Sequence, residues 1–176
     1  PILVVHILVG LFTILFFPKE PKNFKNSHYR IMMLWMNILS SILGIKIDIR
    51  GIPDQSANLF VSNHVTYLDI IIINKLLPVN FIAKEEISSW PVIGRLASKT
   101  GTLFIKRGDN VESSKMIYEM EERFKLQNKI VFFPEGKIGN GKRVRKFHYK
   151  LFKSIENKEL YIQPIAIRLP YRIPNK

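Results

Sequence analysis

The sequence predicts an α/β fold with a mostly parallel central sheet, preceded by two membrane-associated helices. From about residue 45 onward, short runs of apolar residues alternate with helical patterns, which is typical of strand–helix–strand units and a parallel sheet. The first 44 residues form two long apolar segments joined by a charged turn. We therefore expect an N-terminal helical hairpin over 1–44 and an α/β domain over 45–176.

The composition favours a membrane surface as partner. The 176 residues, enough for one core, are 47% hydrophobic, yet their formal net charge is +13. High apolar content together with high positive charge suits a protein half immersed in an anionic membrane better than one bound to nucleic acid. No cysteine is present, which excludes disulfides, Cys-based zinc sites and thiol nucleophiles. We find no metal-ligand cluster and no phosphate or dinucleotide fingerprint, and expect neither metal nor cofactor.

The first apolar segment, residues 2–17, carries no formal charge. It is shorter than the ~20 residues that a membrane-spanning helix needs. A signal peptide is the competing interpretation, but the charged turn 18–22 follows instead of a small-residue cleavage site. The chain begins without Met and ends soon after an apolar run, so we expect both ends to be truncated.

The second segment, residues 27–44, is apolar around most of a helix. Its polar residues Asn37, Ser40, Ser41 and Gly44 form one narrow stripe. Such a helix lies in a deep core or in a membrane. The two segments together suggest a hairpin that dips into one leaflet.

The remaining elements follow from periodicity. Alternation of Ile with charged residues predicts a half-buried strand over 45–50. We expect further strands over 59–61, 80–83, 102–105, 130–133 and 161–169, and helices over 66–77, near Pro91 and over 112–127.

The most informative motif is Asn63-His64 followed by Asp69, directly after the strand 59–61. If a helix begins near Thr66, His64 lies in the turn before it and Asp69 in its first turns. The carboxylate can then fix one imidazole nitrogen while the other faces a cleft, as a general base requires. In the alternative interpretation, His64 only caps the helix and Asp69 is solvated.

Two other strand ends carry charged residues. Glu135 and Gly136 follow the strand 130–133, at the end of a sheet where α/β folds bind ligands; an ordinary turn is the alternative. Lys106 and Arg107 follow the strand 102–105, and an Arg there suits bidentate phosphate binding. Between Lys137 and Lys153 there are seven basic residues and no acid, which also fits a solvated face or a membrane patch.

Taken together, these segments resemble the glycerolipid acyltransferases, specifically the bacterial 1-acyl-sn-glycerol-3-phosphate acyltransferases. The resemblance runs from about Ile31 to Ile167 and rests on four motif blocks in the family's order. The blocks are Asn63-His64 with Asp69; Lys84 to Glu86 with Trp90 to Gly94 and Gly101 to Arg107; Phe133 to Gly136; and Ile162 to Ile167.

The resemblance implies a sandwich fold of that family and acyl transfer from acyl-CoA or acyl carrier protein to lysophosphatidic acid, giving phosphatidic acid. It implies that His64 is the general base and Asp69 orients it. Substrate-binding residues would be Asn63, Lys106, Arg107, Glu135 and Gly136. We expect membrane lipids as partners, no nucleic acid, and a location at the cytoplasmic face of a bacterial inner membrane.

The sequence departs from the family pattern after Gly136. Lys137-Ile138-Gly139 stands where Thr-Arg-Ser or similar is usual, and Phe147-His148 replaces Phe-Lys. The segment 139–144 resembles a subgroup that includes lyso-ornithine lipid acyltransferases, which leaves the acceptor open. Two rival functions are a non-catalytic basic membrane-binding protein, which leaves the ordered blocks unexplained, and nucleic-acid binding, for which no recognition motif occurs.

Overall fold

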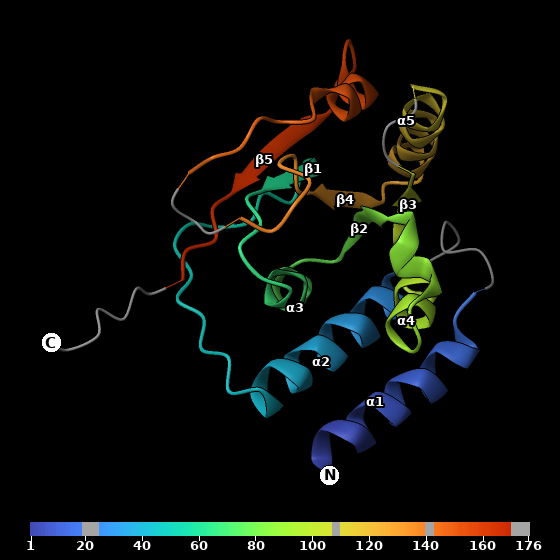
Figure 1. Ribbon diagram of the computed structural model, residues 1–176, viewed down its shortest axis with the longest axis vertical. Coiled ribbons are helices and arrows are strands. Elements are labelled where there is room, and N and C mark those ends of the chain that lie inside the picture. The colour runs from blue at the N-terminus through green and yellow to red at the C-terminus, as the bar shows by residue number, and fades with distance from the viewer. Residues whose placement is uncertain (19–24, 107–109, 140–142, 170–176) are drawn as a thin grey trace, which may run out of the picture.

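The computed structural model describes residues 1–18, 25–106, 110–139 and 143–169 and contains a five-stranded sheet (Figure 1). The strand order is β3-β2-β4-β1-β5, and every pair of neighbours is parallel. This confirms the predicted α/β class with a parallel sheet. The strands are β1 (Ala57–Ser62), β2 (Val79–Lys84), β3 (Leu103–Ile105), β4 (Lys129–Phe132) and β5 (Tyr161–Ile165).

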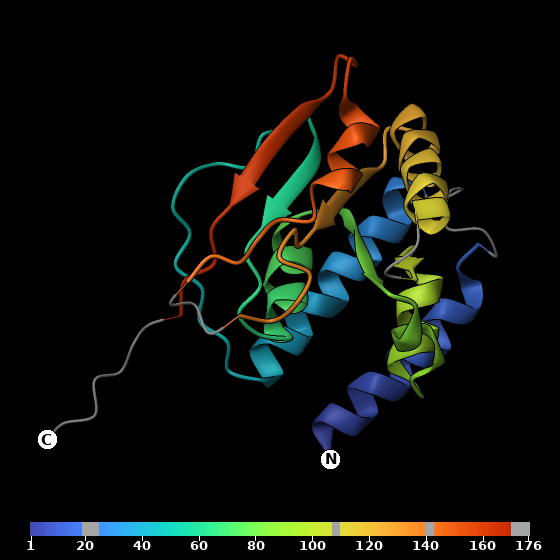
Figure 2. The ribbon, with the colours of Figure 1, turned by 45° about the horizontal axis from the view of Figure 1, so that its top comes forward.

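Helices cover both faces of the sheet (Figure 2). On one face, strand residues such as Leu59 and Ile130 pack against α5 (Asn110–Lys125) and the 3₁₀ helix η4 (Tyr149–Ile155). On the other face, Phe60 and Val131 pack against α3 (Leu68–Leu76). Since neighbouring strand residues point to opposite faces, both faces of the strands are apolar, as expected of a parallel sheet.

The N-terminal helices lie below the α3 face of the sheet. Helix α2 (Asn26–Ile42) packs along α3, and the Tyr29 hydroxyl donates a hydrogen bond of 2.9 Å to Asn80 Oδ1 on β2. Helix α1 (Ile2–Thr13), continued by η1 (Ile14–Phe16), packs on α2 through a narrow stripe. In that stripe, the His6 and Trp35 rings stack at 4.5 Å. A Cβ on Gly10 would come within 2.7 Å of Trp35 Nε1, so only glycine fits there.

The rest of α1 is exposed although it is apolar. Side chains such as those of Leu8 and Phe12 are 59% and 62% exposed. Among the residues described, no helix combines the length and the apolar character needed to cross a membrane.

The predicted strand over 45–50 is wrong. This segment joins no ladder, and Ile49 is 55% exposed. β1, the next strand along the chain, already has neighbours on both sides, β4 and β5, and the segment pairs with neither of the edge strands β3 and β5. Alternation in sequence describes an extended chain, but a strand also needs the fold to bring it beside a strand with which it can pair.

The other elements occur close to where periodicity predicted them. The short helix is α4 (Ile93–Lys99), which follows the 3₁₀ helix η3 (Glu85–Ser89); Pro91 lies in the turn before it rather than in its first turn. The division of the chain at residue 44 stays a prediction, and α2 is packed against the α/β layers rather than separate from them.

Candidate active site

The candidate site lies where two neighbouring strands end. β1 pairs with β4 in the register Val61 to Phe132. The segments that follow the two strands therefore leave the sheet side by side, at the C-terminal ends of the strands. Residues 63–65 follow β1 and residues 133–136 follow β4. The carboxyl edge of a parallel sheet is where α/β proteins bind ligands.

His64 and Asp69 form a hydrogen-bonded pair, as the motif predicted. His64 Nδ1 lies 2.7 Å from Asp69 Oδ2. The same oxygen accepts hydrogen bonds from the backbone N–H groups of Val65 at 2.7 Å and Thr66 at 3.0 Å. Asp69 is fully buried in the first turn of α3, and its Oδ2 contacts the imidazole and both backbone N–H groups at once. With Nδ1 held by Asp69, Nε2 is the nitrogen left to take a proton.

Phe133 and Gly139 fix His64 from the β4 side. The Phe133 and His64 rings are stacked, with centroids 4.0 Å apart and planes inclined by 11°. The Gly139 N–H donates a hydrogen bond of 2.7 Å to the His64 carbonyl oxygen. The imidazole is therefore held by its carboxylate partner, by an aromatic face and through its own backbone.

The turn after β4 presents Glu135. Gly136 has a φ of 68°, a conformation that glycine adopts without strain, and its N–H bonds the Phe133 carbonyl at 2.9 Å. Glu135 is only 7% exposed. Its Oε2 accepts a hydrogen bond of 3.0 Å from the Arg145 N–H, so this carboxylate fastens the returning basic loop to the site.

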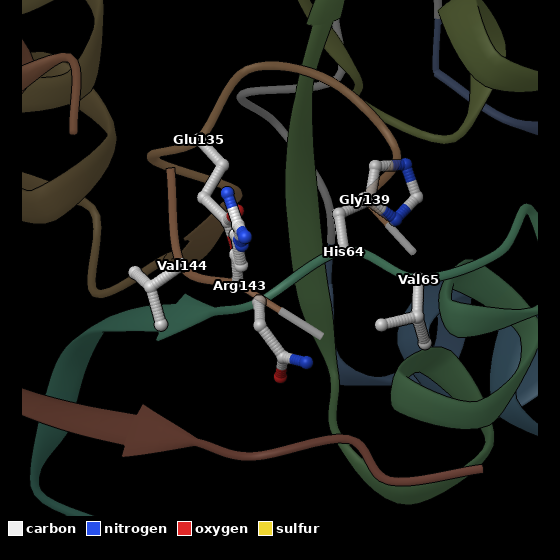
Figure 3. Close-up of a pocket in the computed structure, with 7 residues that line it drawn as sticks. His64, Val65, Glu135, Gly139, Arg143 and Val144 are labelled. Atoms are coloured by element: carbon white, nitrogen blue, oxygen red, sulfur yellow. The ribbon is translucent and has the colours of Figure 1, made fainter. Parts of the chain in front are cut away.

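A cavity of about 110 Å³ lies beside His64 (Figure 3). It contains both charge signs, since Glu135 and Arg143 contribute to the same wall. The lining residues are Asn63, His64, Val65, Glu135, Gly139, Arg143 and Val144. The arrangement can bind a small polar group next to the His64 imidazole. Within the described ranges, no group of three or more His, Asp or Glu residues is placed to hold a metal ion.

The structure brings some of the predicted site residues together and not others. Asn63 lines the cavity, but its amide exchanges two hydrogen bonds with the Ile167 backbone, at 2.9 and 2.7 Å, and so ties the end of β1 to the chain after β5. Lys106 is exposed at the end of β3, which is separated from β1 by β2 and β4, and it is not among the lining residues. Arg107 lies outside the described residues.

Sequence reasoning missed two neighbours of His64. Phe133 was assigned only to a motif block and to the end of a strand. Arg143 was one of the basic residues between 137 and 153, with no role of its own. Only the register of β1 with β4 and the return of the loop bring them to His64. The turn-forming Gly139-Asn140-Gly141 is the one sequence signal for such a return.

Comparison with known proteins agrees with this site. A family model described as Acyltransferase matches residues 46–168, which include both strand ends and the His64–Asp69 pair. The chain belongs to this acyltransferase family. The family assignment predicted from the four motif blocks is thereby confirmed.

Several relatives of this chain have named activities. The chain is 34% identical over 138 residues to the lyso-ornithine lipid O-acyltransferase of Pseudomonas aeruginosa, covering 78% of this chain and 53% of the relative. It is 36% identical over 134 residues to the enzyme of the same name from Rhodobacter capsulatus, covering 74% and 48%. It is 30% identical over 164 residues to the 1-acyl-sn-glycerol-3-phosphate acyltransferase of Helicobacter pylori, covering 92% and 68%. The chain spans about half the length of the first two relatives.

A solved structure supports the fold. The crystal structure of the 1-acyl-sn-glycerophosphate acyltransferase from Thermotoga maritima aligns with a TM-score of 0.65 at 18% identity, covering 92% of this chain and 67% of that one. At this identity the similarity concerns the fold alone.

Proposed function

We propose that the protein is an O-acyltransferase that joins the acyl group of a thioester, acyl-CoA or acyl carrier protein, to the free hydroxyl of a lysolipid. The observation that carries the proposal is the His64 Nδ1–Asp69 Oδ2 hydrogen bond of 2.7 Å at the edge of a cavity. Membership of the acyltransferase family supports it.

In the proposed reaction, His64 Nε2 takes the proton of the lysolipid hydroxyl as its oxygen attacks the thioester carbonyl. The tetrahedral intermediate then collapses, the carbon–sulfur bond breaks, and the proton passes from His64 to the leaving thiolate. Asp69 holds the imidazole and stabilises the imidazolium between these steps. No acyl-enzyme is required, which agrees with a chain that has no cysteine.

For the acceptor we weigh two lysolipids. 1-acyl-sn-glycerol 3-phosphate is the one that the motif blocks implied, with Arg107 as its phosphate partner. Lyso-ornithine lipid carries a carboxylate and an ammonium group. The cavity offers Arg143 and the Glu135 carboxylate together, a pair that complements such a zwitterion better than a phosphate dianion, which Glu135 would repel. The names of the first two relatives support the same choice, and we propose lyso-ornithine lipid as the preferred acceptor.

We also propose that the enzyme works at a membrane, with α1 and the outer face of α2 in contact with one leaflet. The support is the exposed apolar surface of α1 and the net charge of +13, which attracts anionic lipid. Acyl-CoA and acyl carrier protein are cytosolic donors, so we place the site at the cytoplasmic face.

The test is an assay of purified protein with labelled acyl-CoA against both lysolipids. His64→Ala should lower the rate by about 10²–10⁴-fold, and Asp69→Asn should lower turnover more than acceptor affinity. His148→Ala is the matched control, because His148 is exposed on the neighbouring loop. A His64→Ala enzyme that keeps more than about a tenth of the wild-type rate would rule out His64 as the general base.

The same assay tests the acceptor. A preference for lysophosphatidate would favour 1-acyl-sn-glycerol 3-phosphate over lyso-ornithine lipid and leave the proposed acyl transfer unchanged.

A further inference from the structure

The chain between η3 and α4 forms a strained turn that exposes apolar side chains. Val92 has φ 64° and ψ −64°, and the Ile93 N–H bonds the Pro91 carbonyl at 2.6 Å. These values define a γ-turn with positive φ, which is rare, and a β-branched residue is an unusual centre for it. Trp90, Val92 and Ile93 are 42%, 39% and 54% exposed, so core packing does not account for the conformation.

Close packing behind the turn holds it rigid. A Cβ on Gly94 would lie 2.3 Å from the Ser88 carbonyl oxygen, so the start of α4 is pressed directly against η3. The Trp90 N–H bonds the Ile87 carbonyl at 3.1 Å, and the Gly94 N–H bonds the Trp90 carbonyl at 3.0 Å. A strained conformation persists where its surroundings determine it, and such sites are often functional. The side chains of Trp90, Val92 and Ile93 are therefore exposed on a rigid turn, and binding a partner would cost little conformational entropy.

The helix that follows the turn lies against α1. Helix α4 contacts α1, and both views place the two helices side by side (Figures 1 and 2). On α1, Val5, Leu8 and Phe12 are each more than half exposed.

We propose that the turn Trp90–Ile93 is a further contact with the lipid bilayer, next to α1. The inference rests on the proposed membrane contact of α1 and α2. Tryptophan is favoured at the membrane–water interface, where its ring has both an apolar body and a polar N–H. A fixed third point beside two helices would set the orientation of the domain on the membrane.

The charges around the turn are balanced. Lys84 and Arg95 are exposed on either side of it, but so are Glu85 and Glu86. The contact is therefore apolar rather than electrostatic, and it should persist with neutral lipid and in high salt. An acidic protein such as acyl carrier protein would instead choose a strongly basic surface.

The absence of cysteine from the chain permits a direct test, since one introduced cysteine carries the only label. We would attach an environment-sensitive fluorophore to Ile93→Cys, to Phe12→Cys on α1, and to Tyr118→Cys as control. Tyr118 is 64% exposed on α5, across the sheet from α2 and α3. Phosphatidylcholine vesicles in about 1 M salt, where the Debye length is about 3 Å, leave mainly apolar contacts.

The expected result is a blue shift for the labels at 93 and 12 and none for the label at 118. A label at 93 that stays in water while the label at 12 enters the bilayer would overturn the turn's contact and leave the proposed docking of α1 intact. If neither label moves, the docking of both fails. A label at 93 that responds to acyl carrier protein and not to vesicles would make the turn a protein-binding site and overturn the inference.

Unlabelled variants provide an independent measurement. Trp90→Ser with Ile93→Ser should weaken vesicle binding roughly tenfold, because apolar area leaves the bilayer. Tyr118→Ser should leave binding unchanged. Thermal unfolding of both proteins verifies that they fold, and equal binding of all three proteins would contradict the proposal.

Discussion

At the scale of single residues, Phe133 is the neighbour of His64 whose role is easiest to measure. Its ring lies parallel to the imidazole at 4.0 Å. In the proposed reaction His64 takes a proton, and the new cation then faces an aromatic ring; such an interaction contributes about 0.5–2 kcal/mol. We expect Phe133→Leu to lower kcat by roughly 2- to 30-fold with little change in the Michaelis constants.

Phe133→Tyr should restore most of that rate, because it keeps the ring. A Leu variant as fast as wild type would mean that Phe133 only fills space. If Leu and Tyr variants are equally slow, the loss comes from altered packing against Phe81, whose ring is stacked on that of Phe133 at 6.0 Å.

Arg143 is the described cation that lines the cavity, and we predict that it binds the anionic group of the acceptor. Arg143→Ala should raise the acceptor's Michaelis constant about tenfold or more, since a charge-assisted hydrogen bond contributes about 1.5–3 kcal/mol, and leave that for acyl-CoA little changed. Lys146→Ala is the matched control, an exposed cation of the same loop outside the cavity. Steady-state kinetics with each substrate varied separately measures both Michaelis constants. If the two variants raise the acceptor's Michaelis constant equally, Arg143 contributes only long-range electrostatic attraction and does not bind the anionic group.

The His64–Asp69 pair could be predicted from sequence because both residues belong to one local turn. Five residues and a helix start are enough to bring the carboxylate to the imidazole. The stacking of Phe133 could not be predicted, because it depends on β1 and β4 lying side by side in one register. The same limit applies to Asn63, whose hydrogen-bonding partner Ile167 is 104 residues away.

At the scale of elements, Tyr29 couples α2 to the sheet and should make stability depend on pH. Burial raises the pKa of Tyr29 to about 12 from 10.0, against the opposing effects of Arg123 and the Asn80 hydrogen bond. In the unfolded chain the phenol loses its proton near pH 10. The stabilisation from the buried neutral phenol is therefore complete below about pH 10 and is lost as pH rises towards 12.

The free energy of unfolding should accordingly fall by on the order of 2–3 kcal/mol from this group over that interval. Tyr29→Phe should remove this contribution to the decrease of the free energy of unfolding with pH. Tyr118→Phe, at an exposed position, should not. Denaturant unfolding at several pH values between about 9 and 11 measures both. Parallel slopes for wild type and Tyr29→Phe would refute the coupling.

Helices and strands could be predicted from the sequence where the pattern of apolar residues shows which of their faces are buried. The apolar runs of β1 and β4 predicted buried strands, and periodicity predicted a helix over 112–127, where the Met120 and Phe124 side chains of α5 are buried. The segment 45–50 shows the limit of the method. Its alternation matches a strand, but whether an extended segment joins a sheet depends on whether the fold brings it beside a strand with a free side.

At the scale of the whole molecule, the N-terminal helices differ in how they are joined to the domain. Helix α2 packs along α3 and is hydrogen-bonded to β2 through Tyr29. Deleting residues 1–44 would therefore expose core residues, and a loss of membrane binding could not be distinguished from unfolding. Helix α1 touches the rest through a narrow stripe and exposes its other sides. Substitution on the exposed sides of α1 therefore tests membrane attachment without disturbing the core.

We predict that Leu8→Glu with Phe12→Glu lowers binding to anionic vesicles roughly 100-fold or more, since each large apolar side chain transferred from water contributes about 1.5–3 kcal/mol. Tyr118→Glu with Leu126→Glu is the control. Both of its positions are exposed, and it adds the same two negative charges, so the loss of net charge is matched. The electrostatic part of the binding that remains in the α1 variant should disappear in high salt, whereas the proposed apolar contact of the turn Trp90–Ile93 should not. Co-sedimentation of the two variants at low and high salt separates these contributions, and equal binding of both would show that α1 does not enter the membrane.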